Sequence, residues 1–238
     1  MITSLPEIGK AASDFYSKLY SVSPPTVSDD VLHFIPSLVT DADNNMLMEL
    51  PQEEEVKRAV WNLNLNGAPG PDGFNGKFFK KCWHIVRSDL LKVVQEFFMG
   101  ISIPKALSSI LIVLIPKVPN PSSFGEFRPI CISNFVSKVC TKVLTDRLSM
   151  ILPKIISPEQ IGFMKNKDMV DHILIAQEMV HSLNKKVIMN NLQSTYLSVL
   201  VNGVHHDFFQ PKRGVKQGDP LSHFLFILAS KAFSRGIK

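Results

Sequence analysis

Residues 196–209 read YLSVLVNGVHHDFF and carry the clearest structural signal in the chain. Two runs rich in β-branched and aromatic residues flank the dipeptide Asn202-Gly203. Asn-Gly favours the left-handed backbone of a two-residue β-turn, so the stretch predicts an antiparallel hairpin. Because successive strand residues point to opposite faces, His205 and His206 should lie on opposite sides of the sheet.

A further strand is predicted upstream of this hairpin. Residues 107–115 (LSSILIVLI) form a compact run of β-branched and aliphatic residues that ends at Pro116, as in a buried strand. The next segment, KVPNPSSFGEFRP (117–129), is rich in Pro and Ser and is expected to be a loop.

The remaining segments are predicted to be mainly helical. Residues 1–50 are expected to form helix pieces joined by loops, and the Gly- and Pro-dense residues 66–77 an irregular loop. Pro153 should end one helix, and Ser222 should cap the last one. The fold class is therefore α+β and helix-rich. Apolar spacing predicts helices over 51–65, 78–98, 136–151, 168–184 and 223–235.

Length and composition exclude several classes of protein. The chain has 238 residues, 45% hydrophobic and 20% charged, which suits one globular domain or two small ones. Its three cysteines are too few and too far apart for a disulfide framework, which favours a reducing compartment. The longest aliphatic run, 110–115, is far shorter than the about twenty residues of a membrane span. The first residues lack the order of a secretory signal. We therefore expect a protein that is neither secreted nor in the membrane, and its location, nuclear or cytoplasmic, is left open.

Charge is distributed unevenly along the chain. Residues 1–60 carry a net charge of −6 and residues 61–238 a net charge of +11, which together give the overall +5. A basic body suits a polyanionic partner, because binding releases counterions condensed on the phosphates. An ordinary solvated surface with excess lysine explains the same numbers, so charge alone does not decide between them.

Three patterns associated with catalysis or metals are weak. The segment GPDGFNGK (70–77) has the wrong glycine spacing for a phosphate-binding loop and lacks Ser or Thr after its lysine, so a structural turn fits better. The His and Cys residues show no zinc-ligand spacing. The pair Asp29-Asp30 lies in a polar stretch, where helix capping is a better explanation than metal binding.

Basic residues and a Gln-Gly pair mark the other candidate site. Lys117, Arg128 and the loop RGVKQGDPLS (213–222) could hold phosphates, since Arg offers a bidentate fork and Lys a point charge. Glycine in Gln217-Gly218 would allow close approach to a flat base. From the residues alone this is one hypothesis among several.

Four collinear segments together resemble the reverse transcriptase of LINE-type (non-LTR) retrotransposons, particularly those of plants. They cover about half of the chain, and their combination is far more specific than any one of them. The segments are APGPDGFNGKFFKKCW (68–83), LIVLIPKVPNPSSFGEFRPICISNFVSKVCTKVLTDRL (111–148), IISPEQIGFMKNKDMVDHILIAQEMVHSLNKK (155–186) and SVLVNGVHHDFFQPKRGVKQGDPLSHFLFILA (198–229).

The resemblance implies a right-hand polymerase fold with three parts. Residues 1–60 would be an acidic helical lead-in, 61–186 the fingers-like part, and 187–238 a partial palm containing the hairpin, the Gln-Gly loop and a helix.

The resemblance also implies roles for individual residues. Lys117 and Arg128 would hold the triphosphate of an incoming nucleotide, and Gln217 and Gly218 would pack against the template–nucleotide pair. The implied partner is RNA or an RNA–DNA hybrid. The residues expected near the template are Pro69, Gly70, Pro71, Asp72, Gly73, Lys167 and Arg213.

Departures from the family pattern concern catalysis. The intact family uses three aspartates to bind two Mg²⁺ ions, one on a palm strand and two in a later hairpin. Here no aspartate lies between Asp171 and Asp207, as if that palm strand had been excised, and the expected Asp-Asp pair would follow residue 235. The family's upstream endonuclease is also not in this sequence. We therefore expect no bound metal cofactor.

The expected function is that of a reverse-transcriptase fragment that does not polymerise. Two alternatives are a non-catalytic RNA-binding module and a transposon relic or mis-spliced gene model. Excision would also fuse the 168–184 helix with residues 187–193 and remove the centre of the palm sheet.

Overall fold

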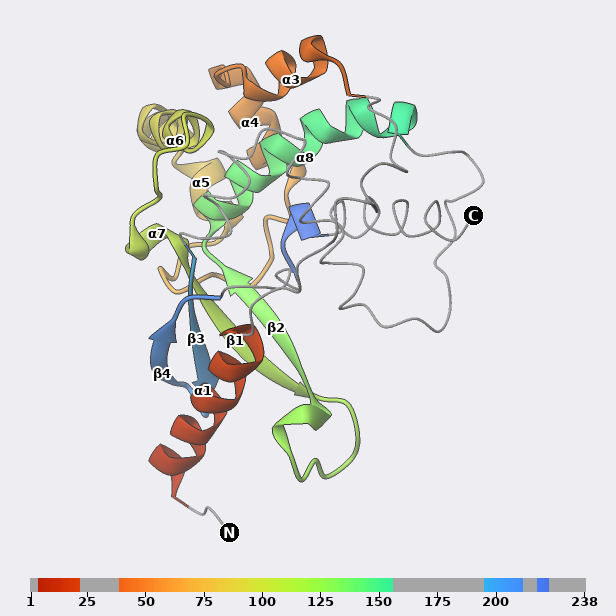
Figure 1. Cartoon of the computed structure of the whole chain (residues 1–238). Helices are drawn as coiled ribbons and strands as arrows, with labels where there is room; N and C mark the ends of the chain where they lie inside the picture. Colours follow the sequence, from red (N-terminus) through yellow and green to blue (C-terminus); the bar gives the residue numbers. More distant parts are fainter. Residues whose placement is uncertain (1–3, 22–38, 156–194, 212–217, 223–238) are drawn as a thin grey trace, which may run out of the picture.

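The computed structural model describes residues 4–21, 39–155, 195–211 and 218–222, and it confirms the α+β class. A cluster of helices lies at one end of a four-stranded sheet, and a further helix lies along that sheet (Figure 1). The elements are α1 (Leu5–Ser21), α3 (Asp41–Met48), α4 (Glu53–Asn62), α5 (Gly76–Lys81), α6 (Trp83–Phe98), α7 (Lys105–Ser108), β1 (Ser109–Pro116), η1 (Phe124–Glu126), β2 (Phe127–Ser133), α8 (Phe135–Ile155), β3 (Tyr196–Val201) and β4 (Val204–Phe209).

The sheet has the strand order β2-β1-β3-β4. β1 pairs with β2 in antiparallel and with β3 in parallel orientation, and β3 and β4 form the predicted antiparallel hairpin. Asn202 and Gly203 have φ values of 48° and 80°, which confirms the left-handed two-residue turn. His206 faces α1, where its ring occupies the space that a side chain at Gly9 would need, while His205 is exposed. The two histidines therefore lie on opposite faces, as predicted.

The loop predicted for residues 117–129 is shorter than expected. Its last residues belong to β2, and a short 3₁₀ helix, η1, precedes them. Pro129 pairs with Leu114 within the strand. This is compatible with a strand because β2 forms an edge of the described sheet, where a proline need not donate to a further neighbour.

Three predicted helices differ in their bounds. The 78–98 helix is divided at Cys82, whose ψ of 14° ends α5 and begins α6. Helix α8 continues two residues past Pro153. Helical backbone begins at Pro220, because the Asp219 carboxylate accepts the Leu221 amide at 2.9 Å and so caps the helix in place of Ser222. The helix predicted over 168–184, its fusion with 187–193, the rest of the last helix and Asp29-Asp30 lie outside the described residues.

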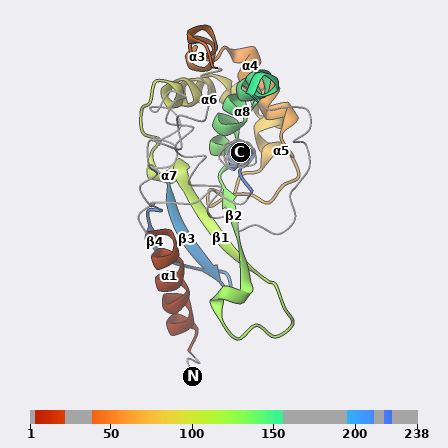
Figure 2. The ribbon, with the colours of Figure 1, turned by 45° about the vertical axis from the view of Figure 1, so that its right-hand side comes forward.

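Two hydrophobic clusters form the core of the described chain. The larger joins α3, α4, α5, α6 and α8, and the smaller joins α1 to the sheet. In the smaller cluster Ala12 and Tyr16 of α1 are buried with Leu197 and Val199 of β3, so α1 covers one face of the sheet (Figure 2). The Tyr16 hydroxyl donates to the Phe124 carbonyl at 3.0 Å, which fixes the β1–β2 connection to α1.

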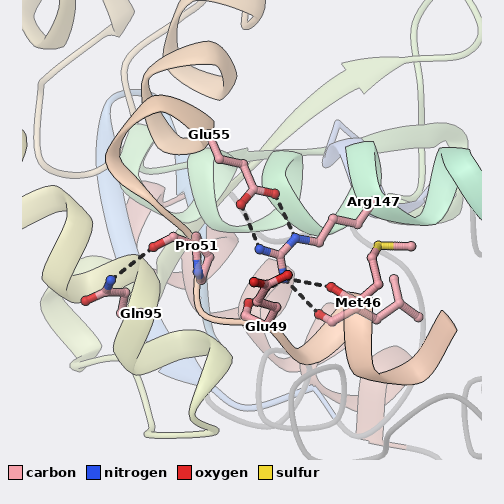
Figure 3. A network of polar contacts seen from close by, with 7 residues as sticks. Met46, Glu49, Pro51, Glu55, Gln95 and Arg147 are labelled. Atoms are coloured by element: carbon pink, nitrogen blue, oxygen red, sulfur yellow. Dashed lines mark hydrogen bonds and ion pairs between the residues drawn. The ribbon is translucent and has the colours of Figure 1, made fainter. Parts of the chain in front are cut away.

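A buried arginine holds the helical cluster together. Nε and Nη2 of Arg147 on α8 each donate to a carboxylate oxygen of Glu55 on α4 at 2.7 Å (Figure 3). Its third nitrogen donates to backbone carbonyls at the end of α3, those of Met46, Leu47 and Glu49. One side chain thereby satisfies the C-terminal carbonyls of one helix and pairs with a second helix.

The sheet crosses the boundary expected between the fingers-like part and the partial palm. The hairpin β3–β4 comes after residue 186, yet β3 lies directly beside β1 in one continuous sheet. Among the described residues, none of the helices has the length and apolar character needed to cross a membrane.

Candidate nucleic-acid interface

Lys117 and Arg128 lie together near the far end of the β1–β2 pair. Arg128 is opposite Ile115, and the Lys117 amide donates to the Glu126 carbonyl at 2.7 Å, which extends the pairing by one step. Both side chains are exposed. The Lys117 ammonium donates to the Gly125 carbonyl at 2.9 Å, whereas the Arg128 guanidinium makes no hydrogen bond or ion pair with another described residue. The arrangement presents two cations on one antiparallel pair.

The loop that joins these strands is held by its own hydrogen bonds. The Glu126 carboxylate accepts the backbone amides of Ser122 at 2.6 Å and Ser123 at 3.1 Å. These bonds lower the pKa of Glu126 from its ordinary value. The loop conformation therefore depends on a carboxylate that stays ionised at neutral pH.

Gly218 packs against β2, the strand that carries Arg128. It has a φ of 111°, and a Cβ there would lie 2.9 Å from the Cys131 carbonyl oxygen. Only glycine meets both conditions without a shift of the backbone. Cys131 lies three residues along β2 from Arg128, about 10 Å in an extended strand. The close approach allowed by Gly218 is thus made to the protein's own strand.

The segment Pro69–Gly73 forms the structural turn predicted for it. The Gly73 amide donates to the Gly70 carbonyl at 3.0 Å, and Gly73 has a φ of 77°. The Asp72 carboxylate accepts the Phe74 amide at 3.0 Å, as is common for aspartate in turns. Pro69 and Gly73 are exposed, Pro71 and Asp72 are half-buried, and Gly70 is buried.

Asn134, which the sequence analysis did not single out, joins this turn to the sheet. Its side-chain oxygen accepts the Asp72 amide at 3.1 Å, and its nitrogen donates to the carbonyls of Ala106 at 2.8 Å and Leu107 at 3.2 Å. A Cβ on Gly70 would lie 2.5 Å from the Asn134 amide nitrogen, so the turn packs directly on this residue. The only signal in the sequence is an asparagine just before a predicted helix, which resembles an ordinary helix cap, and its full burial is seen only in the structure.

Three charges gather around this junction. Burial lowers the pKa of Lys138, in the first turn of α8, and the charges of Asp219 and Asp72 oppose that effect. The structure thus brings two segments that are far apart in the sequence, the turn and the start of the last helix, to the same end of α8. We call the surroundings of Asn134 and Lys138 the turn junction.

The predicted site residues therefore occupy two places. Lys117 is at one end of β1, and the turn junction is at the other, since Ile110 pairs with Ser133 next to Asn134. Eight residues of strand, spanning about 23 Å, separate them. Gln217, Lys167 and Arg213 lie outside the described residues. Within the described part of the chain, no three His, Cys, Asp or Glu side chains are grouped as metal ligands would be.

The chain is similar to proteins of mobile elements. It is 22% identical over 265 residues to the "Transposon TX1 uncharacterized 149 kDa protein" of Xenopus laevis, covering 93% of this chain and 20% of that protein. It is 24% identical over 244 residues to the "Retrovirus-related Pol polyprotein from type-2 retrotransposable element R2DM" of Drosophila melanogaster, covering 87% of this chain and 22% of that protein.

A third relative extends the same pattern. The "Retrovirus-related Pol polyprotein from type-1 retrotransposable element R1" of Bradysia coprophila is 23% identical over 167 residues, covering 66% of this chain and 17% of that protein. The chain thus spans about a fifth of the length of these curated relatives. No protein-family model matches it. These relatives are proteins of transposons and retrotransposable elements, and their similarity over most of the chain supports a LINE-type reverse-transcriptase-like region.

Proposed function

We propose that this chain is a reverse-transcriptase-derived region that binds RNA or an RNA–DNA hybrid through the β1–β2 pair. The observation that carries the proposal is the pair of exposed cations on neighbouring strands, Lys117 and Arg128. Arg128 has no partner within the described residues, so its five donors are available to a phosphate. The relatedness to retrotransposon polyproteins supports the same assignment.

We further propose that the chain does not polymerise nucleotides. Two-metal phosphoryl transfer needs carboxylates that hold both ions, and no aspartate lies between Asp171 and Asp207, where the family places its first one. Primer extension with Mg²⁺ or Mn²⁺ on an RNA template tests this. The expected result is no extension product, and template-dependent synthesis by the purified chain would contradict it.

The binding proposal is tested with a fluorescein-labelled RNA–DNA hybrid in an anisotropy titration at several salt concentrations. The double variant Lys117→Ala/Arg128→Ala should weaken binding because two phosphate contacts are lost. The slope of log K against log salt should become shallower by roughly 1.4–1.8. A matched control, Lys10→Ala/Lys92→Ala, removes two exposed lysines on α1 and α6 and should leave the slope nearly unchanged. If both double variants changed the slope equally, binding would depend on the overall charge of the chain and not on Lys117 and Arg128.

A further inference from the structure

A second basic surface lies on the helical cluster. It consists of exposed residues of α4 and α5 that the β1–β2 pair does not include: Arg58, Trp61, Lys77, Lys80 and Lys81. We call it the Trp61 surface. In both views of the ribbon, α4 and α5 are at the opposite end of the molecule from the loop between β1 and β2 (Figures 1 and 2).

An aromatic pair forms the centre of the Trp61 surface. The rings of Trp61 and Trp83 lie 5.4 Å apart and at 90° to each other, so each restrains the other. Trp83 is half-buried against the core, whereas Trp61 keeps 36% of its surface exposed. A large indole held in place and open to solvent is a suitable surface for stacking of an unpaired base.

Cations surround this aromatic pair. On α5 the lysines at positions 77, 80 and 81 have the spacing of one helix face, and the Lys80 ammonium lies 5.7 Å from the Trp61 ring centroid. Arg58 lies one turn before Trp61 on α4, so it belongs to the same side of that helix.

The acidic residues of α4, the helix that carries Trp61, are already paired. The Glu54 carboxylate lies 3.7 Å from the Lys57 ammonium, and that of Glu53 lies 3.2 Å from the Arg87 guanidinium. These pairs are neutral, so the Trp61 surface keeps the charge of its four cations, of which Lys80 lies against the indole. A surface of this charge favours a polyanion.

We propose that the Trp61 surface binds a single-stranded nucleic acid. An unpaired base would stack on the exposed part of Trp61, and the lysines of α5 would contact the flanking phosphates. Stacking requires a base that is not already paired, which favours a single strand over a duplex, and an acidic peptide offers charge without a stacking partner. The surface involves neither Lys117 nor Arg128, so the inference does not depend on the function proposed for the β1–β2 pair.

The chain offers a direct measurement, since Trp61 and Trp83 are its only two tryptophans. Trp83→Phe leaves Trp61 as the single source of indole fluorescence, with an apolar ring retained in the core. In this background we would titrate twelve-residue oligouridylate at 50 mM salt. Saturable quenching is expected, and adding Lys80→Ala/Lys81→Ala should raise Kd at least about fivefold. Lys10→Ala/Lys92→Ala should leave Kd within about twofold.

The outcomes separate this inference from its alternatives. Quenching that follows Lys80 and Lys81 supports it, whatever the hybrid-binding experiment gives. Absent quenching, or a Kd unchanged by Lys80→Ala/Lys81→Ala, overturns it. Equal quenching by a blunt RNA duplex or by polyglutamate also overturns it, and these two comparisons need no further variant. Circular dichroism of each variant verifies that helix content is retained.

Discussion

The helical cluster and the sheet use their arginines in opposite ways. Arg147 is buried between α3, α4 and α8, and all three of its nitrogens have partners within the protein. Arg128 is exposed on an edge strand and makes no hydrogen bond or ion pair with another described residue. The first contributes to the fold, because an unpaired buried charge is costly. The second contributes little to the fold and is available to a phosphate.

The sharpest test of this comparison is Arg147→Ala. It leaves the Glu55 carboxylate and the carbonyls at the end of α3 without their donors, so we expect a loss of about 3–5 kcal/mol in the free energy of unfolding. Urea unfolding followed by circular dichroism measures it. Arg87→Ala breaks an exposed pair with Glu53 in the same cluster and should cost less than about 1 kcal/mol. Similar losses in both variants would contradict the assigned role of Arg147.

The turn junction should respond less strongly than Arg147. Asn134→Ala removes the partner of the Asp72 amide and of the Ala106 carbonyl. The free energy of unfolding, measured by thermal unfolding, should therefore fall by about 2–3 kcal/mol. Ser137→Ala is the control. It removes one hydrogen bond to the Leu107 carbonyl, which Asn134 still satisfies, and should cost about 1 kcal/mol or less. If Ser137→Ala were the more damaging variant, Asn134 would not be the residue that joins the turn to the sheet.

These residues also show what the sequence could predict. The hairpin at 202–203 and the β1 strand were predicted correctly, since Asn-Gly turns and β-branched runs are encoded within a few neighbouring residues. The division at Cys82 was missed because apolar periodicity continues across it without a proline or glycine.

Contacts between distant residues were less predictable still. The Asn134 contact to Asp72 spans 62 positions and the Arg147 contact to Glu55 spans 92, and no local pattern specifies such pairs. For the same reason the sequence did not indicate that Gly218 would pack on Cys131. From the residues alone Lys117 and Arg128 were one hypothesis among several, and only the resemblance implied a specific role for them, because an exposed cation has no spacing of its own.

A pH-dependent effect is expected where α3 meets α8. A hydrogen bond from Lys154, aided by two from Thr40, lowers the pKa of Asp43 from 3.8 to about 2. The stability that these bonds provide is complete above about pH 4 and is lost as pH falls toward 2. Thermal unfolding measured at pH 5, 3 and 2 should therefore show that the melting temperature falls less with acid for Asp43→Asn than for the parent. The control Asp146→Asn removes a more exposed carboxylate from α8, and its melting temperature should fall with acid as much as that of the parent. If the melting temperatures of Asp43→Asn and Asp146→Asn fell equally with acid, the assignment to Asp43 would be contradicted.

The smallest effect on stability is expected at the β1–β2 pair. Lys117→Ala/Arg128→Ala should change the free energy of unfolding by less than about 0.5 kcal/mol, because both side chains are exposed and the guanidinium has no described partner. Urea unfolding of this variant beside Arg147→Ala completes the comparison. A loss above about 1 kcal/mol would mean that the two cations support the fold, and reduced RNA binding could then not be attributed to lost phosphate contacts.

The parallel pairing of β1 with β3 has a consequence for the protein during its synthesis. Ser109 pairs with Tyr196, about 87 residues later, whereas β2, the other neighbour of β1, follows within a short loop. At roughly 5–20 residues per second, a ribosome needs about 4–17 s to supply β3 after β1 has emerged. During that interval β1, which carries Ile110 and Ile112, is paired with β2 but not yet with β3. Its open edge can then pair with another nascent chain. Until the last strands arrive, nothing in the finished fold covers this edge, so aggregation of the nascent chain is most favoured in that interval.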